Sequence, residues 1–385
     1  MTEKNKFKFP VGYQHFHEQE NINFQLNRLI LNGASSEEVK KIAPKIKDFN
    51  DWKRELVLLA EKAEEEDRKL NAAWYYRAAE FFVSSEDPDK EILYDKFIEL
   101  FYDIYEEVVA LKENIPYENT TLPSIHLKSK VSGEKKKGVV VLHGGYDSFL
   151  EELYLMGLYI RDSGYEVVLF EGPGQGGVLI KQELAMTPEW EKPVRAVLDH
   201  FNFNDINLIG LSLGGYLGLR AAAFESRITK VVAFDVIYDF FQVLLFAAGE
   251  KVRQMVESFL NSGKIKMLNK TMERVMQHDL LVNWGVNHGM HVFGVDTPYG
   301  YMEEARKYST AEFSDKITCH VLLMAGTNDH FIPVEMFYRQ IEALKNVKSL
   351  TCRLFTEQEH GANHCQYGNL QLALDFILNW MEIIK

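Results

Sequence analysis

The residue best suited to nucleophilic chemistry is Ser212, at the centre of the sequence Gly-Leu-Ser-Leu-Gly-Gly (residues 210–215). The apolar run 206–209 before it is typical of a short buried strand, and residues 216–223 after it are typical of a helix. A serine between strand and helix in the pattern G-x-S-x-G forms a nucleophile elbow, a strained turn that exposes the hydroxyl. The alternative, in which small residues only pack a helix on a strand, does not require this order of elements. We therefore expect Ser212 to attack a carbonyl carbon.

A serine hydroxyl needs a neighbouring base, and the base needs an acid that orients it. Along the chain, the acid and then the histidine are expected after the serine. Asp329 lies on the loop after an apolar strand at 320–324, where a carboxylate can reach an imidazole. Aspartate also caps helices, which is the structural alternative for this residue. Asp235, at the end of the preceding strand, is the alternative acid.

Two histidines, His360 and His364, follow the last expected strand, and on position alone either can be the base. Together with Cys365 they also have the spacing of metal ligands. A zinc site would need further ligands, and the nearby candidates are His288 and His291. The base is the stronger interpretation, so we expect no metal.

Attack on a carbonyl group also requires hydrogen-bond donors for the oxyanion. The N–H of Leu213, at the start of the helix after the serine, is expected to be one donor. The second is expected from the loop after an earlier strand, in the sequence His-Gly-Gly-Tyr at 143–146. Gly145 is the preferred donor and Tyr146 the alternative.

A second glycine-rich run, Gly-Pro-Gly-Gln-Gly-Gly at 172–177, also follows an expected strand. Such loops can bind phosphate, but the spacing is not G-x-G-x-x-G and Pro173 lacks an amide donor. We interpret the run as a tight turn beside the site and expect no cofactor.

The candidate residues lie within a regular alternation of strands and helices that starts near residue 121. Strands are expected at 121–128, 138–142, 165–170, 206–209, 228–234, 320–324 and 349–355. This alternation predicts an α/β fold with a mostly parallel sheet and helices on both faces. Ligands of such sheets bind beyond the carboxyl ends of the strands, which is where Ser212 and Asp329 lie.

Two segments are expected to be helical additions to this α/β domain (residues 121–385). Residues 1–120 show helical periodicity and no clear strand, which predicts a separate domain of four or five helices. Residues 238–312 form a long, aromatic-rich helical insertion. Because the insertion leaves the sheet at a strand end, we expect it to cover the site.

Composition limits the partners and the compartment. The 385 residues carry a net charge of −13, which argues against nucleic acid or an anionic membrane as a partner. Three cysteines give no disulfide framework, and the first residues lack the apolar run of a signal peptide. A cytoplasmic protein acting on a small molecule is the expectation, with a homodimer left open.

These motifs resemble those of the serine α/β-hydrolases, over residues 139 to the C-terminus and more weakly over the helical N-terminal segment. Within them, the chain resembles the group of 2,6-dihydroxypseudooxynicotine hydrolase and the fermentation-respiration switch esterase, which is related to acylaminoacyl and prolyl oligopeptidases. The matching segments are 144–148 with 151–152, 171–176, 210–215, 283–294 and 361–369.

The resemblance implies that His364 rather than His360 is the catalytic histidine and that the N-terminal helices cap the site. The peptidases carry a β-propeller that has no counterpart here, and the carbon–carbon hydrolase of the group uses an additional glutamate. The acids near its position are Asp235 and Asp239, which match it poorly.

We therefore predict a serine hydrolase of a small acyl ester or amide that works through an acyl-enzyme. A peptidase-like enzyme, a carbon–carbon bond hydrolase and an acyltransferase are the alternatives on the same three residues. Tyr146 in the oxyanion loop, and Trp284 and His288 in the insertion, are expected to contact the substrate.

Overall fold

The computed structural model describes residues 8–131, 133, 136–246 and 248–384. At its centre is an eight-stranded sheet with the order β1-β2-β4-β3-β5-β6-β7-β8. The strands are β1 (Lys112–Tyr117), β2 (Thr120–Leu127), β3 (Val139–His143), β4 (Glu166–Phe170), β5 (Ile206–Leu211), β6 (Ile228–Phe234), β7 (His320–Gly326) and β8 (Ser349–Phe355). From β4 to β8 all neighbours are parallel, whereas β1 and β2 are antiparallel at one edge. The predicted α/β fold with a mostly parallel sheet is confirmed.

The central strands are mostly apolar because both faces of the sheet are covered. Every residue of β5 and β7 is buried. Successive residues of β6 point to opposite faces, so that Val231 joins one buried cluster and Val232 the other. This two-sided burial is the reason that continuous apolar runs, rather than alternating ones, identified these strands.

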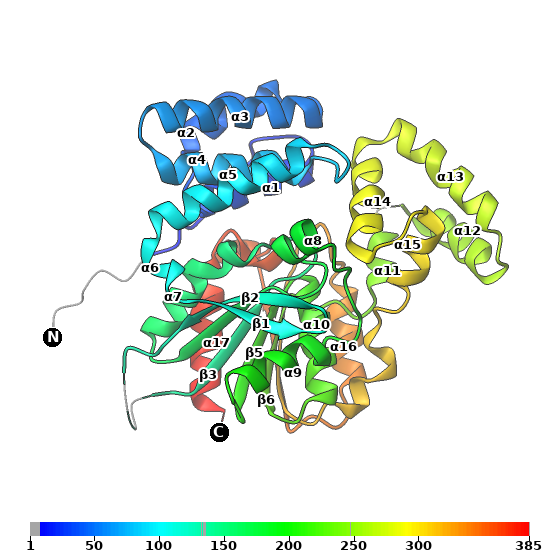
Figure 1. Cartoon of the computed structure of the whole chain (residues 1–385). Coiled ribbons are helices and arrows are strands. Elements are labelled where there is room, and N and C mark those ends of the chain that lie inside the picture. The colour runs from blue at the N-terminus through cyan, green and yellow to red at the C-terminus, as the bar shows by residue number, and fades with distance from the viewer. Residues whose placement is uncertain (1–7, 132, 134–135, 247, 385) are drawn as a thin grey trace.

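Helices cover the two faces of the sheet in separate layers. On one face the buried cluster includes residues of α7 (Tyr154–Asp162) and α17 (Leu370–Ile383), and on the other those of α9 (Glu191–His200), α10 (Leu213–Phe224) and α16 (Glu335–Ala343). A short helix, α8 (Gly176–Gln182), follows β4. Figure 1 shows this layered arrangement.

The N-terminal part is helical up to residue 109. Its helices are α1 (Glu20–Leu31), α2 (Ser36–Ile42), α3 (Phe49–Glu65), α4 (Lys69–Phe81), α5 (Asp89–Ile104) and α6 (Glu106–Val109). The predicted absence of strands before residue 121 is wrong, because β1 belongs to the sheet and pairs with β2. Pro116 is tolerated within β1 because β1 is an edge strand, where a missing N–H need not interrupt the ladder.

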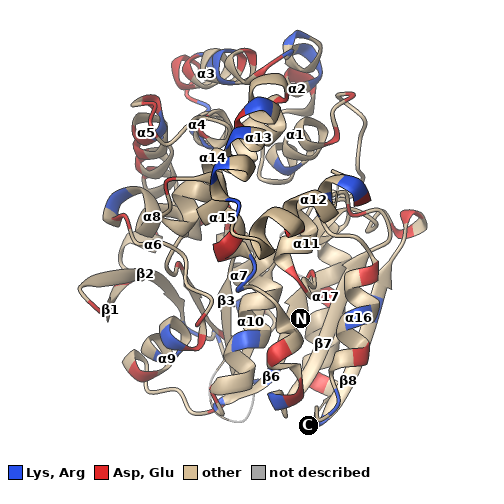
Figure 2. Ribbon diagram, turned by 90° about the vertical axis from the view of Figure 1, so that its right-hand side faces the viewer, with Lys and Arg blue, Asp and Glu red and all other residues tan. Residues whose placement is uncertain are grey.

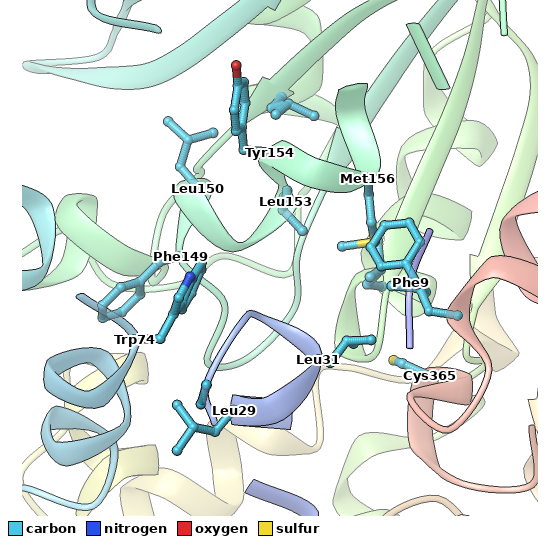
Figure 3. Packing of buried hydrophobic residues seen from close by; sticks show 14 of the residues in the cluster. Phe9, Leu29, Leu31, Trp74, Phe149, Leu150, Leu153, Tyr154, Met156 and Cys365 are labelled. Carbon is cyan, nitrogen blue, oxygen red and sulfur yellow. The ribbon is translucent and has the colours of Figure 1, made fainter. Parts of the chain in front are cut away.

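The N-terminal helices share a hydrophobic core with the α/β part. Figure 3 shows Trp74 of α4 beside Phe149, which lies in the segment after β3. Leu29 and Leu31 of α1 and Leu150 belong to the same buried cluster. All five side chains are buried in one cluster with one face of the sheet. Burial of this apolar surface holds the N-terminal helices on the sheet.

The second helical addition follows β6. It contains α11 (Phe240–Leu244), α12 (Glu250–Asn261), α13 (Ile265–His278), α14 (Leu280–Phe293) and α15 (Pro298–Ala305). In Figure 1 it lies beside the N-terminal helices, at the same end of the sheet. The two additions touch where the Trp284 ring stacks on Phe81 at 5.2 Å and its Nε1–H donates to the Phe81 carbonyl at 3.2 Å.

The outer helices have mixed charge. Figure 2 shows acidic and basic residues interspersed along helices such as α3 and α16. Among the residues that the structure describes, no helix combines the length and the apolar character needed to cross a lipid bilayer.

Candidate active site

Ser212 occupies a sharp turn between β5 and α10. Its backbone has φ 59° and ψ −125°, which is an uncommon conformation for a residue with a side chain. The turn brings two glycines together, since a Cβ on Gly210 would lie 1.9 Å from the carbonyl oxygen of Gly214. Any larger residue at 210 would force strand and helix apart, so the glycine is required for this placement of Ser212.

Three side chains from separate loops form a continuous chain of contacts. His364 Nε2 lies 2.9 Å from Ser212 Oγ, and His364 Nδ1 lies 2.6 Å from Asp329 Oδ2. His364 and Asp329 are buried. His360, by contrast, is exposed at the surface. Of the two histidines that position alone left open, the structure places His364 beside Ser212.

Asp329 does not cap a helix, since the N-cap of α16 is Val334. Its Oδ1 accepts the backbone N–H groups of Phe331 at 2.8 Å and Ile332 at 3.0 Å within the loop after β7. Its Oδ2 remains free to bond to His364. These two backbone bonds therefore hold the carboxylate in the orientation that faces the imidazole.

Asp235, the alternative acid, lies close to the same histidine. Its Oδ2 is 3.7 Å from His364 Nδ1, which is too long for a hydrogen bond. Instead, its two oxygens accept the N–H of Cys365 and the side-chain amide of Gln366, both at 2.8 Å. Asp235 thus fixes the loop that carries His364, while Asp329 makes the direct contact.

The two carboxyl groups, those of Asp329 and Asp235, differ in their pKa values. Burial opposes the charge on Asp329, but the attraction of His364 and the hydrogen bonds outweigh it, so its pKa lies below the ordinary value. Burial, and then repulsion by Asp329, raises the pKa of Asp235 to about 7. Burial also opposes the charge on His364, but Asp329 outweighs it and raises the pKa of His364 well above its ordinary value. Asp329 is therefore the charged partner of the imidazole.

The loop after β3 lies directly against the elbow. A Cβ on Gly145 would be 2.7 Å from the backbone nitrogen of Leu213, so only glycine allows this approach. Leu213 begins α10, and its N–H points out of the helix end. The N–H of Gly145 donates to Ser148 Oγ in a long hydrogen bond of 3.4 Å.

Gln175 fixes this loop, and the sequence had not identified it as a site residue. Its side-chain amide donates to the carbonyl oxygens of Gly144 and Gly145, both at 2.9 Å, and the side chain is buried. The glycine-rich run that carries it was interpreted only as a turn. The run does turn beside the site, and its glutamine determines the orientation of the peptide planes at Gly144 and Gly145.

The N-terminal helices reach the same loop through buried ion pairs. Arg28 of α1 bonds to Asp147 at 3.1 Å and to Glu152 at 2.8 Å. Arg77 of α4 donates to the Asp147 carbonyl at 2.7 Å and to the Glu152 carboxylate at 3.1 Å. Phe24 of α1 also packs over the His364 ring, with centroids 5.8 Å apart. Neither arginine nor Phe24 has a local sequence signal that marks it as part of the site.

The three predicted substrate contacts come together beside the loop. The His288 ring stacks on Trp284 at 5.1 Å and meets Tyr146 edge-on at 4.9 Å. All three line one cavity between the N-terminal helices, α8 and α14. Since Tyr146 follows Gly145 directly, this cavity adjoins the loop that faces the elbow.

A metal site is not supported by the available donors. Among the described residues, Asp235, His364 and Cys365 have potential ligand atoms within 4.8 Å of one another. Both nitrogens of His364 are already engaged by Ser212 and Asp329. This set therefore does not suit zinc, and His360, which the spacing paired with His364, is exposed.

Comparison with known proteins shows the family to which this chain belongs. The model of the Alpha/beta hydrolase family matches residues 139–368, which is more than half of the chain. Hydrolase LUC6 of Fusarium sp is 29% identical over 94% of this chain and 96% of its own, and hydrolase acrC of Aspergillus aculeatus is 27% identical over 81% and 80%. The crystal structure of 2,6-dihydroxy-pseudo-oxynicotine hydrolase shares the fold over 92% of this chain and 94% of its own, with a TM-score of 0.65 at 18% identity. The chain belongs to the α/β-hydrolase family and is a hydrolase, as the motifs around Ser212 predicted.

Proposed function

We propose that this hydrolase cleaves a small acyl ester or amide through an acyl-enzyme on Ser212. The observation that carries the proposal is the unbroken chain from Ser212 through His364 to Asp329, with separations of 2.9 and 2.6 Å. This is the arrangement in which an imidazole can take the serine proton while a carboxylate stabilises the resulting charge.

In the first half of the proposed reaction, Ser212 Oγ attacks the substrate carbonyl carbon and its proton passes to His364 Nε2. The amides of Leu213 and Gly145 stabilise the oxyanion of the tetrahedral intermediate. The intermediate collapses when His364 returns the proton to the departing alcohol or amine. In the second half, water attacks the acyl-enzyme with the same histidine as base, and the acid product and free Ser212 are released.

The surrounding elements suit a small organic substrate. We propose that residues 1–120 act as a cap on the α/β domain at 121–385, together with the insertion at 238–312. Arg28 and Phe24 tie the cap to the site, and Tyr146, Trp284 and His288 would contact the substrate. The proposed reaction needs no cofactor, metal, nucleic acid or membrane. We propose a cytoplasmic setting for it.

Acyl transfer is the second candidate, because the same acyl-enzyme can pass its group to an alcohol or amine where the cap excludes water. The burial of His364 beneath Phe24 favours such exclusion. Carbon–carbon and peptide bond cleavage remain as alternatives on the same three residues.

The proposal is tested by incubating the enzyme with a panel of acyl esters and aminoacyl amides and measuring the intact protein mass after rapid quenching. We expect turnover of at least one class and a mass increase equal to the acyl group. Added alcohol or amine then separates hydrolysis from transfer by the product that forms. If a slowly deacylating substrate were turned over and no covalent adduct formed, the reaction would not pass through an acyl-enzyme, and the proposal would be wrong.

Replacing Gln175 by alanine is expected to lower kcat by about 10- to 100-fold with little change in KM. The variant loses both bonds to the loop carbonyls, and a misplaced oxyanion donor matters only in the transition state. Steady-state kinetics on the best ester measures this split. Gln182→Ala, at the other end of α8, is the matched control and should behave as wild type. An equal rise in KM for Gln175→Ala would indicate a role in substrate binding instead.

A further inference from the structure

Tyr146 joins the loop after β3 to the insertion at 238–312. It follows Gly145, the proposed second oxyanion donor, directly in the chain. Its ring lies against three rings of the insertion, with centroid separations of 4.9 Å to His288, 5.3 Å to Phe240 and 6.1 Å to Phe293. These partners come from α11 and α14, so two helices of the insertion hold the ring.

The hydroxyl of Tyr146 is held by a third helix. It forms a hydrogen bond with the hydroxyl of Tyr301, at an oxygen–oxygen distance of 3.1 Å. Tyr301 belongs to α15, is buried and stacks on Phe293 at 5.7 Å. Because packing fixes Tyr301, its hydroxyl defines where the Tyr146 side chain ends.

Gly289 of α14 leaves the room that the two tyrosines need. A Cβ on Gly289 would lie 2.2 Å from the Tyr301 ring and 2.7 Å from the Tyr146 hydroxyl oxygen. For Gly285, one turn earlier in the same helix, such a Cβ would have no described heavy atom from outside the helix within 4 Å. Glycine is therefore required at 289 by the contact with the tyrosines, and it is not required at 285.

The loop that carries Tyr146 is in close contact with the elbow. A Cβ on Gly145 would lie 2.7 Å from the backbone nitrogen of Leu213, so a small movement of the loop changes the spacing of the two proposed oxyanion donors. Gln175 holds this loop through the carbonyl oxygens of Gly144 and Gly145, both at 2.9 Å. Tyr146 attaches the same loop to the insertion, so the loop is held at two points.

We propose that Tyr146 is a positioning residue through which the insertion holds the N–H of Gly145 toward the elbow. The inference rests on the proposed function, because it concerns an oxyanion donor of the same reaction. The oxyanion forms in the transition state and is absent from the substrate complex, so a misplaced donor lowers kcat and leaves KM nearly unchanged. The insertion thus contributes to catalysis, in addition to its proposed role as a cover.

The test removes the bond between the hydroxyls from either side, with Tyr146→Phe, Tyr301→Phe and the double variant. Each single variant should lower kcat for the best ester or amide by about 5- to 10-fold, with KM within about twofold of wild type. The double variant should lose no more than either single variant, because both substitutions remove the same bond. Tyr159→Phe, in α7, is the matched control: it loses the bond from its hydroxyl to Asp375 at 2.5 Å and should retain the wild-type rate.

Gly289→Ala tests the same contact by crowding instead of deletion. The added methyl group must displace Tyr301 and Tyr146, so kcat should fall by about 10- to 100-fold. Gly285→Ala adds the same methyl group to the same helix without a clash and should keep the wild-type rate. Thermal unfolding shows whether each variant is folded, and if Gly289→Ala does not fold, the tyrosine variants alone decide.

An inhibitor that mimics the tetrahedral intermediate separates positioning from a loss of folded enzyme. A trifluoromethyl ketone with the acyl group of the best substrate would place an oxyanion between the amides of Gly145 and Leu213. Its inhibition constant should rise by the factor by which kcat falls in Tyr146→Phe and Tyr301→Phe. A smaller fraction of folded enzyme would lower the rate and leave that constant unchanged, which would overturn the inference.

A higher KM in Tyr146→Phe together with wild-type kinetics in Tyr301→Phe would make the Tyr146 hydroxyl a substrate contact and would also overturn the inference. A third contrary result is a kcat within about twofold of wild type in both variants, with Ser212 still forming its acyl adduct, and it leaves the proposed function intact. If the wild type turns over no ester or amide and Ser212 forms no adduct, both proposals fall.

Discussion

Ser212→Ala is expected to lower kcat/KM for the best ester by about 10³-fold or more while leaving the fold intact. The variant retains the amides of Leu213 and Gly145, but it has no oxygen to form the acyl-enzyme. Alanine is smaller than serine and removes only the hydroxyl, so packing at the elbow is preserved. Initial rates with a chromogenic ester and thermal unfolding of the same samples measure the two effects.

Ser262→Ala, in the insertion and remote from His364, is the control for a serine substitution and should retain wild-type rates. If Ser212→Ala kept activity within a few-fold of wild type, the nucleophile would have to be another group, and the elbow argument would be wrong.

Asp329→Asn is expected to reduce kcat by about 10³- to 10⁴-fold. The asparagine can still accept the N–H groups of Phe331 and Ile332, but an amide facing His364 stabilises the wrong tautomer. Asp235→Asn should cost less than about tenfold, because Asp235 bonds to the loop at Cys365 and Gln366 rather than to the imidazole.

The pH dependence distinguishes the two acids as well. The base must be neutral, and Asp329 raises the pKa of His364 above its ordinary value of 6.5, so kcat/KM of the wild type should rise with pH above that value. Removing the charge of Asp329 should move this rising limb to lower pH. A larger rate loss and a larger shift in Asp235→Asn would instead make Asp235 the acid.

The central strands of the sheet could be predicted from the sequence because they are buried on both faces. The predicted bounds 228–234 and 349–355 coincide with β6 and β8. The edge strand β1 was missed because Pro116 contradicts a central strand and the sequence does not reveal which strands lie at an edge.

The candidate site could be predicted from the sequence only in part. Ser212 and Asp329 each follow a recognisable strand, but spacing could not separate His364 from His360, and the choice depended on a family resemblance. The bond between Arg28 and Glu152 joins residues 124 positions apart, so no local pattern could reveal it. Gln175 stood in a visible motif, yet its role depends on a loop that only the folded chain brings beside it.

The most direct test of the central claim is labelling by a fluorophosphonate, followed by peptide mapping, in the wild type, His364→Ala and His360→Ala. The account predicts one adduct on Ser212 in the wild type and in His360→Ala, and greatly slowed labelling in His364→Ala, because the serine there keeps its proton. Normal labelling of Ser212 in His364→Ala together with its loss in His360→Ala, or an adduct at another residue, would contradict it.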